Sequence, residues 1–142
     1  MTQPTLRSAA LVHAGDELPP FDKHVTIVTN FLFGVPFWTA HRLHYDTISA
    51  QEDGYDAPLI PGALMTAYAS RVLVGWAGRP DALRELTSRA TASAVVGETI
   101  SIRGTVRSIE ATANGALATC DLTVSSGERA LMSITGVVEL AL

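Results

Sequence analysis

The chain contains 142 residues, of which 47% are apolar and only 17% are charged, and its formal net charge is −4. This length and composition predict one globular domain over residues 1–142, large enough to fold around its own core. The low charge content indicates surface that another subunit covers, and the scattered arginines exclude the clustered cations of a nucleic-acid interface.

Cysteine content and apolar runs bear on the cellular compartment. Cys120 is the only cysteine, so no disulfide can form within the chain, which fits a reducing environment. Its position in a strand-like run favours a small core residue. The first residues lack the charged and apolar regions of a signal peptide, and no apolar run is long enough to span a membrane. We therefore expect a cytoplasmic protein without a membrane partner.

The first 60 residues alternate between loops and short elements. Residues 1–20 form a polar, proline-punctuated lead-in. The β-branched alternation from His24 to Thr29 predicts a strand. Residues 31–38 carry an aromatic and aliphatic cluster, which predicts a short helix or turn that either packs over a helix or lines an acyl pocket. Residues 51–56 are polar and predict a loop with one helical turn.

Residues 61–77 have the clearest helical pattern. Pro61 suits the first position of a helix, where its missing N–H is not needed. Apolar residues then recur at helical spacing on one face, namely Met65, Ala69, Val72, Leu73 and Trp76. Arg71 is the only charged residue of the segment, which is typical of a buried helix, and Gly78 and Pro80 end it.

The remainder of the chain predicts four antiparallel strands. Apolar and polar residues alternate over 86–96, 100–107, 117–125 and 132–140. Asn114-Gly115 predicts a tight hairpin turn. One strand, a long buried helix and four further strands form an α+β pattern, and a five-stranded antiparallel sheet wrapped around one helix is the hot-dog fold. Because such a sheet leaves its edges open, we expect a homodimer or higher oligomer.

Two histidines and a carboxylate lie shortly before the long helix, in the run His41-Arg42-Leu43-His44-Tyr45-Asp46. The start of a helix offers unpaired N–H groups and a partial positive charge. A proton-transfer group beside such donors is the minimum requirement for chemistry next to a carbonyl group. Histidine suits proton transfer because it titrates near neutral pH.

Other chemistries fit these residues less well. His41, His44 and Asp46 are ligand types that suit zinc or iron, but their tight spacing favours a metal site only in a helix, and the segment predicts a loop. The chain has neither a Gly-x-Ser-x-Gly nucleophile motif nor a phosphate-binding or dinucleotide fingerprint. We therefore expect neither a metal nor an organic cofactor.

The segment from Asp22 to about Leu73 resembles the MaoC-type hydratases and dehydratases, which are hot-dog enzymes acting on acyl-CoA or acyl-carrier thioesters. The nearest branch contains the mesaconyl-CoA hydratases and the mitochondrial 3-hydroxyacyl-thioester dehydratases. That branch often shows His-Arg-Ile-His-Tyr-Asp, then Glu-Gly-Tyr-Pro-Gly-Leu and His-Gly-Pro-Leu. The corresponding runs here are His41–Asp46, Asp53–Leu59 and Pro61–Leu64.

The resemblance implies a hydro-lyase of fatty acid metabolism that hydrates an enoyl thioester or dehydrates a 3-hydroxyacyl thioester. His44 would be the acid and base, and the N–H of Gly62 would hold the enolate oxygen. Asp46 would either orient His44 or cap the following turn, and His41 would either assist or lie on the surface. The residues expected to contact substrate are Ser70, Trp38 and Tyr55.

Two positions depart from the family pattern. The catalytic aspartate of the family, five residues before its histidine, is replaced by Thr39, whose hydroxyl can hold a water but cannot act as a carboxylate base. The histidine before the helix glycine is replaced by Pro61. The loss at Thr39 supports an alternative, a non-catalytic hot-dog subunit that binds acyl thioesters or completes a hetero-oligomeric dehydratase. A thioesterase is disfavoured because residues 61–77 carry no carboxylate.

Overall fold

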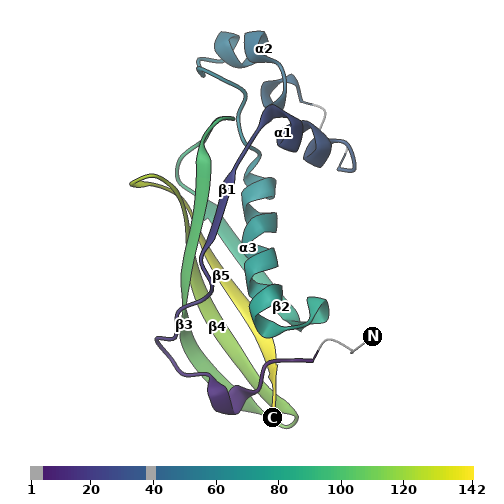
Figure 1. The fold of residues 1–142 in the computed structure, drawn as a ribbon, viewed down its shortest axis with the longest axis vertical. Helices are drawn as coiled ribbons and strands as arrows, with labels where there is room; N and C mark the ends of the chain where they lie inside the picture. Colours follow the sequence, from purple (N-terminus) through teal and green to yellow (C-terminus); the bar gives the residue numbers. More distant parts are fainter. Residues whose placement is uncertain (1–4, 38–40) are drawn as a thin grey trace.

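The computed structural model describes residues 5–37 and 41–142. An antiparallel sheet of five strands in the order β1-β3-β4-β5-β2 lies against one long helix, α3, which covers Gly62–Ala77 (Figure 1). The strands are β1 (Phe21–His24), β2 (Leu83–Ala90), β3 (Thr99–Thr112), β4 (Gly115–Ser126) and β5 (Arg129–Ala141). This arrangement confirms the predicted hot-dog fold.

Strands β3, β4 and β5 form the body of the sheet, and their alternating apolar residues share one core with α3. On β4 the buried side chains are Ala116, Ala118, Cys120, Leu122 and Val124. Cys120 is a core residue, as expected, and burial raises the pKa of its thiol to about 11. Helix and sheet approach closely at Gly136 of β5, where a Cβ would collide with the side chain of Leu73.

The hairpin between β3 and β4 turns one residue earlier than its sequence cue predicts. Thr112 pairs with Gly115, so the loop contains only Ala113 and Asn114. Gly115 already belongs to β4, and a Cβ there would collide with the carbonyl group of Leu140 on β5. The glycine therefore allows close strand packing instead of forming the turn.

Helix α3 confirms the predicted helix with a shift of one residue at its start. Pro61 is the N-cap and Gly62 is the first helical residue, while Gly78 ends the helix with a φ of +95°. The whole predicted apolar face is buried, namely Met65, Ala69, Val72, Leu73 and Trp76. The opposite face is exposed at Ala67, Arg71 and Gly75, so within this chain the helix is buried on one side only.

The strand predicted from His24 to Thr29 is wrong. Strand β1 ends at His24, and helix α1 covers Ile27–Gly34. The hydroxyl of Thr26 accepts the N–H of Thr29 at 3.2 Å and so caps this helix. Here a local cap outweighs the strand preference of β-branched residues.

Strand β2 ends earlier than its predicted limit at Val96, and the residues that follow it run beside the segment that enters α3. The N–H of Ile60 donates to the carbonyl oxygen of Ala94 at 2.8 Å, and the N–H of Val96 donates to that of Pro58 at 2.9 Å. These bonds fix the entrance to α3.

Two short helices and a 3₁₀ turn lie beyond the N-terminal end of α3 (Figure 1). They are α1, the turn η2 (Arg42–His44) and α2 (Thr47–Glu52). The aromatic stretch lies partly in α1, which ends at Gly34, and residues 35–37 form a turn, so the predicted short helix or turn is present as far as the structure describes this stretch. The helical turn predicted within 51–56 begins earlier, at Thr47, and the chain then turns at Gly54, whose φ is +86°.

The N-terminal lead-in pairs with the sheet, which its polar composition did not predict. The N–H of Leu18 donates to the carbonyl oxygen of Gly104 at 2.9 Å, and the N–H of Val106 donates to that of Asp16 at 2.9 Å. Together with β1, this segment covers one edge of the sheet. Within the described residues, no helix combines the length and the hydropathy needed to cross a membrane.

Candidate active site

His44 ends the turn η2 and lies half-buried beside the segment that enters α3. Its Nδ1 is 2.9 Å from the carbonyl oxygen of Leu59. Because a carbonyl oxygen can only accept, Nδ1 carries the proton in the neutral ring and Nε2 keeps a lone pair. The N–H of Leu59 donates in turn to the carbonyl oxygen of Leu43 at 3.0 Å. The two bonds fix the His44 ring and the backbone before it next to Leu59, which is three positions before Gly62.

Gly62 opens α3, and within the described residues its N–H has no acceptor. The N-cap Pro61 has no side-chain oxygen to satisfy the first turn. The exposed start of α3 therefore offers hydrogen-bond donors and the positive end of the helix dipole. A Cβ at Gly62 would make only ordinary contact, 3.7 Å from Cε of Met132, so packing does not require glycine here.

The carboxylate of Asp46 caps α2. Its Oδ1 accepts the N–H groups of Ile48 at 3.0 Å and Ser49 at 3.2 Å, and its Oδ2 accepts from Nε of Arg42 at 3.0 Å. The Arg42 bond, followed by the backbone bonds, lowers the pKa of Asp46. Of the two roles that the sequence left open, the structure contains the cap, and the described residues include no bond from this carboxylate to His44.

His41 lies on the surface as the N-cap of η2. Its Nδ1 accepts the N–H of Leu43 at 3.3 Å, and its ring centre is 6.2 Å from that of His44. The two imidazoles are therefore neighbours in an edge-to-face arrangement. In the part of the chain that the structure describes, no group of three or more His, Cys, Asp or Glu side chains is arranged to hold a metal ion.

Among the described residues, Ser70 and Tyr55, two of the residues expected to contact substrate, make only local hydrogen bonds. The hydroxyl of Ser70 donates to the carbonyl oxygen of Ala67 at 2.8 Å, within α3. Ser70 lies eight residues beyond Gly62, or about 12 Å along the helix. Tyr55 is on the surface after α2. The remaining two predicted site residues, Thr39 and Trp38, lie outside the described residues.

Asn30 contacts the candidate site, although its sequence position did not predict this. It is the only buried polar side chain among the described residues, with 1% exposure. Its amide nitrogen donates to the carbonyl oxygens of Leu59 at 2.7 Å and His44 at 3.1 Å. Its Oδ1 has no hydrogen-bond partner among the described residues, and an unsatisfied buried acceptor costs about 1–3 kcal/mol. The feature of the sequence that could have indicated Asn30 is a single amide side chain within a largely apolar stretch.

The apolar side chains of α1 form an exposed patch next to η2. An open hollow of about 270 Å³ is lined by Ile27, Val28, Phe31, Leu32 and Tyr45. Phe31 is 53% exposed and Leu32 is 64% exposed, so these two side chains do not pack over a helix, which was one of the two predicted alternatives. Phe33 does pack against the core. Exposed apolar patches of this kind mark interaction surfaces.

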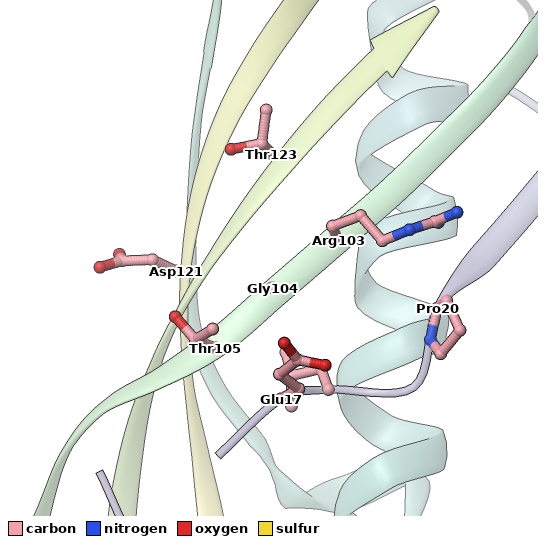
Figure 2. A pocket seen from close by; sticks show the side chains of 8 residues that line it. Glu17, Pro20, Arg103, Gly104, Thr105, Asp121 and Thr123 are labelled. Carbon is pink, nitrogen blue, oxygen red and sulfur yellow. The ribbon is translucent and has the colours of Figure 1, made fainter. Parts of the chain in front are cut away.

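A larger hollow, of about 680 Å³, lies on the surface beside β3 and β4, where Arg103 and Asp121 point in opposite directions (Figure 2). Arg103 is paired with Asp22 at 2.9 Å, and Asp121 with Arg107 at 2.7 Å. The bond from Arg107 lowers the pKa of Asp121. Because these charges already have partners and His44 does not line the hollow, its size alone does not make it the active site.

Comparison with known proteins bears on the fold. No protein-family model matches the chain, and no curated protein matches its sequence. Among solved structures, the chain is similar to a MaoC-like dehydratase, with a TM-score of 0.89 and 20% identity over 97% of this chain and 43% of that one. The chain therefore spans less than half the length of that protein.

Two further solved structures match over nearly their whole length. An (R)-hydratase from A. caviae involved in PHA biosynthesis has a TM-score of 0.83 and 16% identity, over 93% of this chain and 99% of that one. A chain of the ChsH1-ChsH2 complex from Mycobacterium tuberculosis has a TM-score of 0.82 and 15% identity, over 92% and 99%. At these identities the similarity shows the hot-dog fold alone.

Proposed function

We propose that this chain is a hydro-lyase that catalyses reversible hydration of an enoyl thioester carried by CoA or an acyl carrier protein. The observation that carries the proposal is the bond from Nδ1 of His44 to the carbonyl oxygen of Leu59, which leaves Nε2 unprotonated and ties the ring to a residue three positions before Gly62. The names of two structural neighbours, a MaoC-like dehydratase and an (R)-hydratase, support the same reaction class.

The reaction needs one proton to be taken and one to be returned. Nε2 of His44 takes a proton from water as the water oxygen bonds to the β-carbon. The electron pair of the double bond moves toward the carbonyl group, and the N–H of Gly62 donates to the resulting enolate oxygen. The imidazolium then protonates the α-carbon, so both hydrogens of water remain in the product and His44 is neutral again.

Three further residues have supporting roles in this proposal. The hydroxyl of Thr39 holds the attacking water where the family has a carboxylate, which leaves His44 as the single base and acid. Asp46 acts indirectly, because its cap on α2 and its pair with Arg42 fix the backbone that follows His44. His41 assists His44 from the neighbouring position, where its ring centre is 6.2 Å from that of His44. The substrate contacts of Ser70, Trp38 and Tyr55 stay predictions.

A substrate panel tests the reaction class. The purified chain is incubated with enoyl-CoA esters of increasing chain length and, separately, with 3-hydroxyacyl-CoA esters, and the products are measured by mass spectrometry. We expect enoyl esters to gain one water and hydroxyacyl esters to lose one. Release of free CoA without hydration would indicate a thioesterase and contradict the proposal.

A second candidate is a non-catalytic subunit that completes a hetero-oligomeric dehydratase. Thr39 in place of a carboxylate and the exposed patch of α1 favour it, and one structural neighbour is a complex of two proteins. This candidate predicts that the folded chain alone hydrates none of the panel. It also predicts hydration once a hot-dog partner with an intact Asp and His is added.

We also propose that the chain assembles with a second hot-dog subunit. Strand β2 lies at the end of the sheet and is mostly exposed, and α3 is covered on one side only. An uncovered sheet edge pairs readily with another strand. Analytical ultracentrifugation of the chain alone should show a homodimer or larger species. A stable monomer would contradict self-assembly and leave only the hetero-oligomer of the second candidate.

A further inference from the structure

Asn30 connects three separate segments around His44. Its amide nitrogen, on α1, reaches the carbonyl oxygen of His44 in η2 and that of Leu59 before α3, at 3.1 and 2.7 Å. The Leu59 oxygen is also the acceptor for Nδ1 of His44, at 2.9 Å. One buried side chain therefore holds both the backbone of His44 and the acceptor of its ring.

Two converging carbonyl oxygens require a side chain with two donors on one atom. The amide nitrogen of asparagine has two hydrogens, whereas a serine hydroxyl has one and an ionised aspartate has none. Because both partners of Asn30 are acceptors, the orientation of its amide is fixed. The consequence is that Oδ1 stays buried with no partner in the part of the chain that the structure describes. Buried polar groups in folded proteins are almost always hydrogen-bonded, so an unpaired one needs an explanation. A role in function is one recognised explanation.

We propose that Asn30 is a positioning residue that holds His44 in its Nδ1-protonated form with Nε2 free for proton transfer. This inference rests on the proposed function, in which His44 moves the protons. Without the amide of Asn30, the Leu59 carbonyl loses one of its two donors and the His44 backbone loses its tether. The ring then samples the other tautomer and other orientations.

Nitrogen-15 NMR of the histidine rings tests the inference without requiring any activity. The chain has only four histidines, and His44→Ala identifies the signals of His44. Wild-type His44 should show the Nδ1-protonated tautomer when neutral. In Asn30→Leu, which has a similar shape and no donors, we expect a mixture of tautomers. The matched control is Thr29→Val on the same helix, and it should match the wild type, because among the described residues the Thr29 hydroxyl bonds only Thr26.

Kinetics on the preferred enoyl-CoA supply the second readout. Asn30→Leu should lower kcat by about 10–100-fold with little change in KM, since a displaced base slows chemistry more than binding. Asn30→Ser keeps one donor and should give intermediate values of both readouts. The serine variant also serves as the test if the leucine variant does not fold.

Several outcomes overturn the inference and are distinct from failure of the proposed function. An Nε2-protonated His44 in the wild type would overturn it, as would a folded Asn30→Leu with wild-type tautomer and kcat. An active wild type with the tautomer unchanged in Asn30→Leu would retain the hydratase function and reject the role of Asn30. A tautomer that changes in a protein without hydratase activity would retain the role and reject the function.

Discussion

The sheet with α3 and the segment that carries His44 are stabilised by different interactions. The sheet and α3 share a continuous core of fully buried side chains, including Leu73, Ile100 and Val138. The α1–α2 segment, which we define as the described residues 27–37 and 41–60, instead exposes large apolar side chains such as Phe31 and Ile48. Capping bonds and a buried amide hold it in place.

In the proposed mechanism, this difference assigns stability to one region of the fold and proton transfer to the other. Packing in the sheet and α3 determines whether the chain folds, and α3 also supplies the open helix start at Gly62. The α1–α2 segment supplies His44 through a few directional bonds, so small changes there alter geometry before they alter stability. Regions with few buried contacts are also those that move most readily.

The largest expected effect is the loss of stability from truncating the core. Leu73→Ala should lower the free energy of unfolding by about 2–5 kcal/mol, because it leaves a cavity against Gly136 of β5. Leu32→Ala, on the exposed patch of α1, should change it by less than about 0.5 kcal/mol. Urea unfolding measures both. Equal losses would mean that α1 belongs to the same packed core.

The second prediction removes a single hydrogen-bond donor from the start of α3. Gly62→Pro deletes the N–H, and the helix should tolerate it because proline suits the first position and Pro61 is already extended, with a ψ of 132°. Hydration should fall about 10²–10³-fold at unchanged stability. Gly62→Ala is the control, since it adds a Cβ that has room and keeps the N–H.

An equal loss of hydration in Gly62→Pro and Gly62→Ala would assign the effect to the added carbon atoms. A wild-type rate in folded Gly62→Pro would show that another group holds the enolate oxygen. Either result would remove Gly62 from the proposed mechanism.

The smallest effect concerns the cap on α2. Because Arg42 lowers the pKa of Asp46 below its ordinary 3.8, the charged cap stabilises the fold above that pH, and this contribution is lost as the pH falls through the lowered value. Asp46→Asn keeps a capping oxygen and loses the charge. Its Tm should be slightly below that of the wild type at pH 6, and the difference should vanish in acid.

Asp56→Asn, an exposed change in the loop after α2, is the control for this prediction. A Tm difference between Asp46→Asn and the wild type that grew as the pH fell would contradict the assigned sign.

Local periodicity predicted the sheet and α3 because each element is defined by its own neighbours. The alternating apolar residues of β4 are buried as expected, and so are the apolar residues on the helical face from Met65 to Trp76. The predictions of secondary structure fail where a helix cap or a hydrogen bond between distant residues determines the local structure. The hydroxyl of Thr26 caps α1 inside a strand-like pattern, and residues 94–96, which were predicted to continue β2, instead pair with the segment that enters α3.

The candidate site was only partly predictable for the same physical reason. A resemblance over a short run identified His44 and Gly62, and the structure places them at the same end of α3. The bond from His44 to Leu59 joins residues 15 positions apart, and the bonds of Asn30 span up to 29 positions. Contacts of that range do not follow from the local pattern, so Asn30 became visible only in the folded chain.

The most direct test of the proposed reaction is the hydration rate of an enoyl-CoA by His44→Ala compared with His13→Ala. His13 is an exposed histidine in the N-terminal lead-in and serves as the matched control. We predict that His44→Ala loses about 10²–10⁴-fold in turnover at an unchanged Tm, while His13→Ala keeps the wild-type rate. Wild-type turnover by folded His44→Ala would contradict the assignment of His44 as the proton-transfer group.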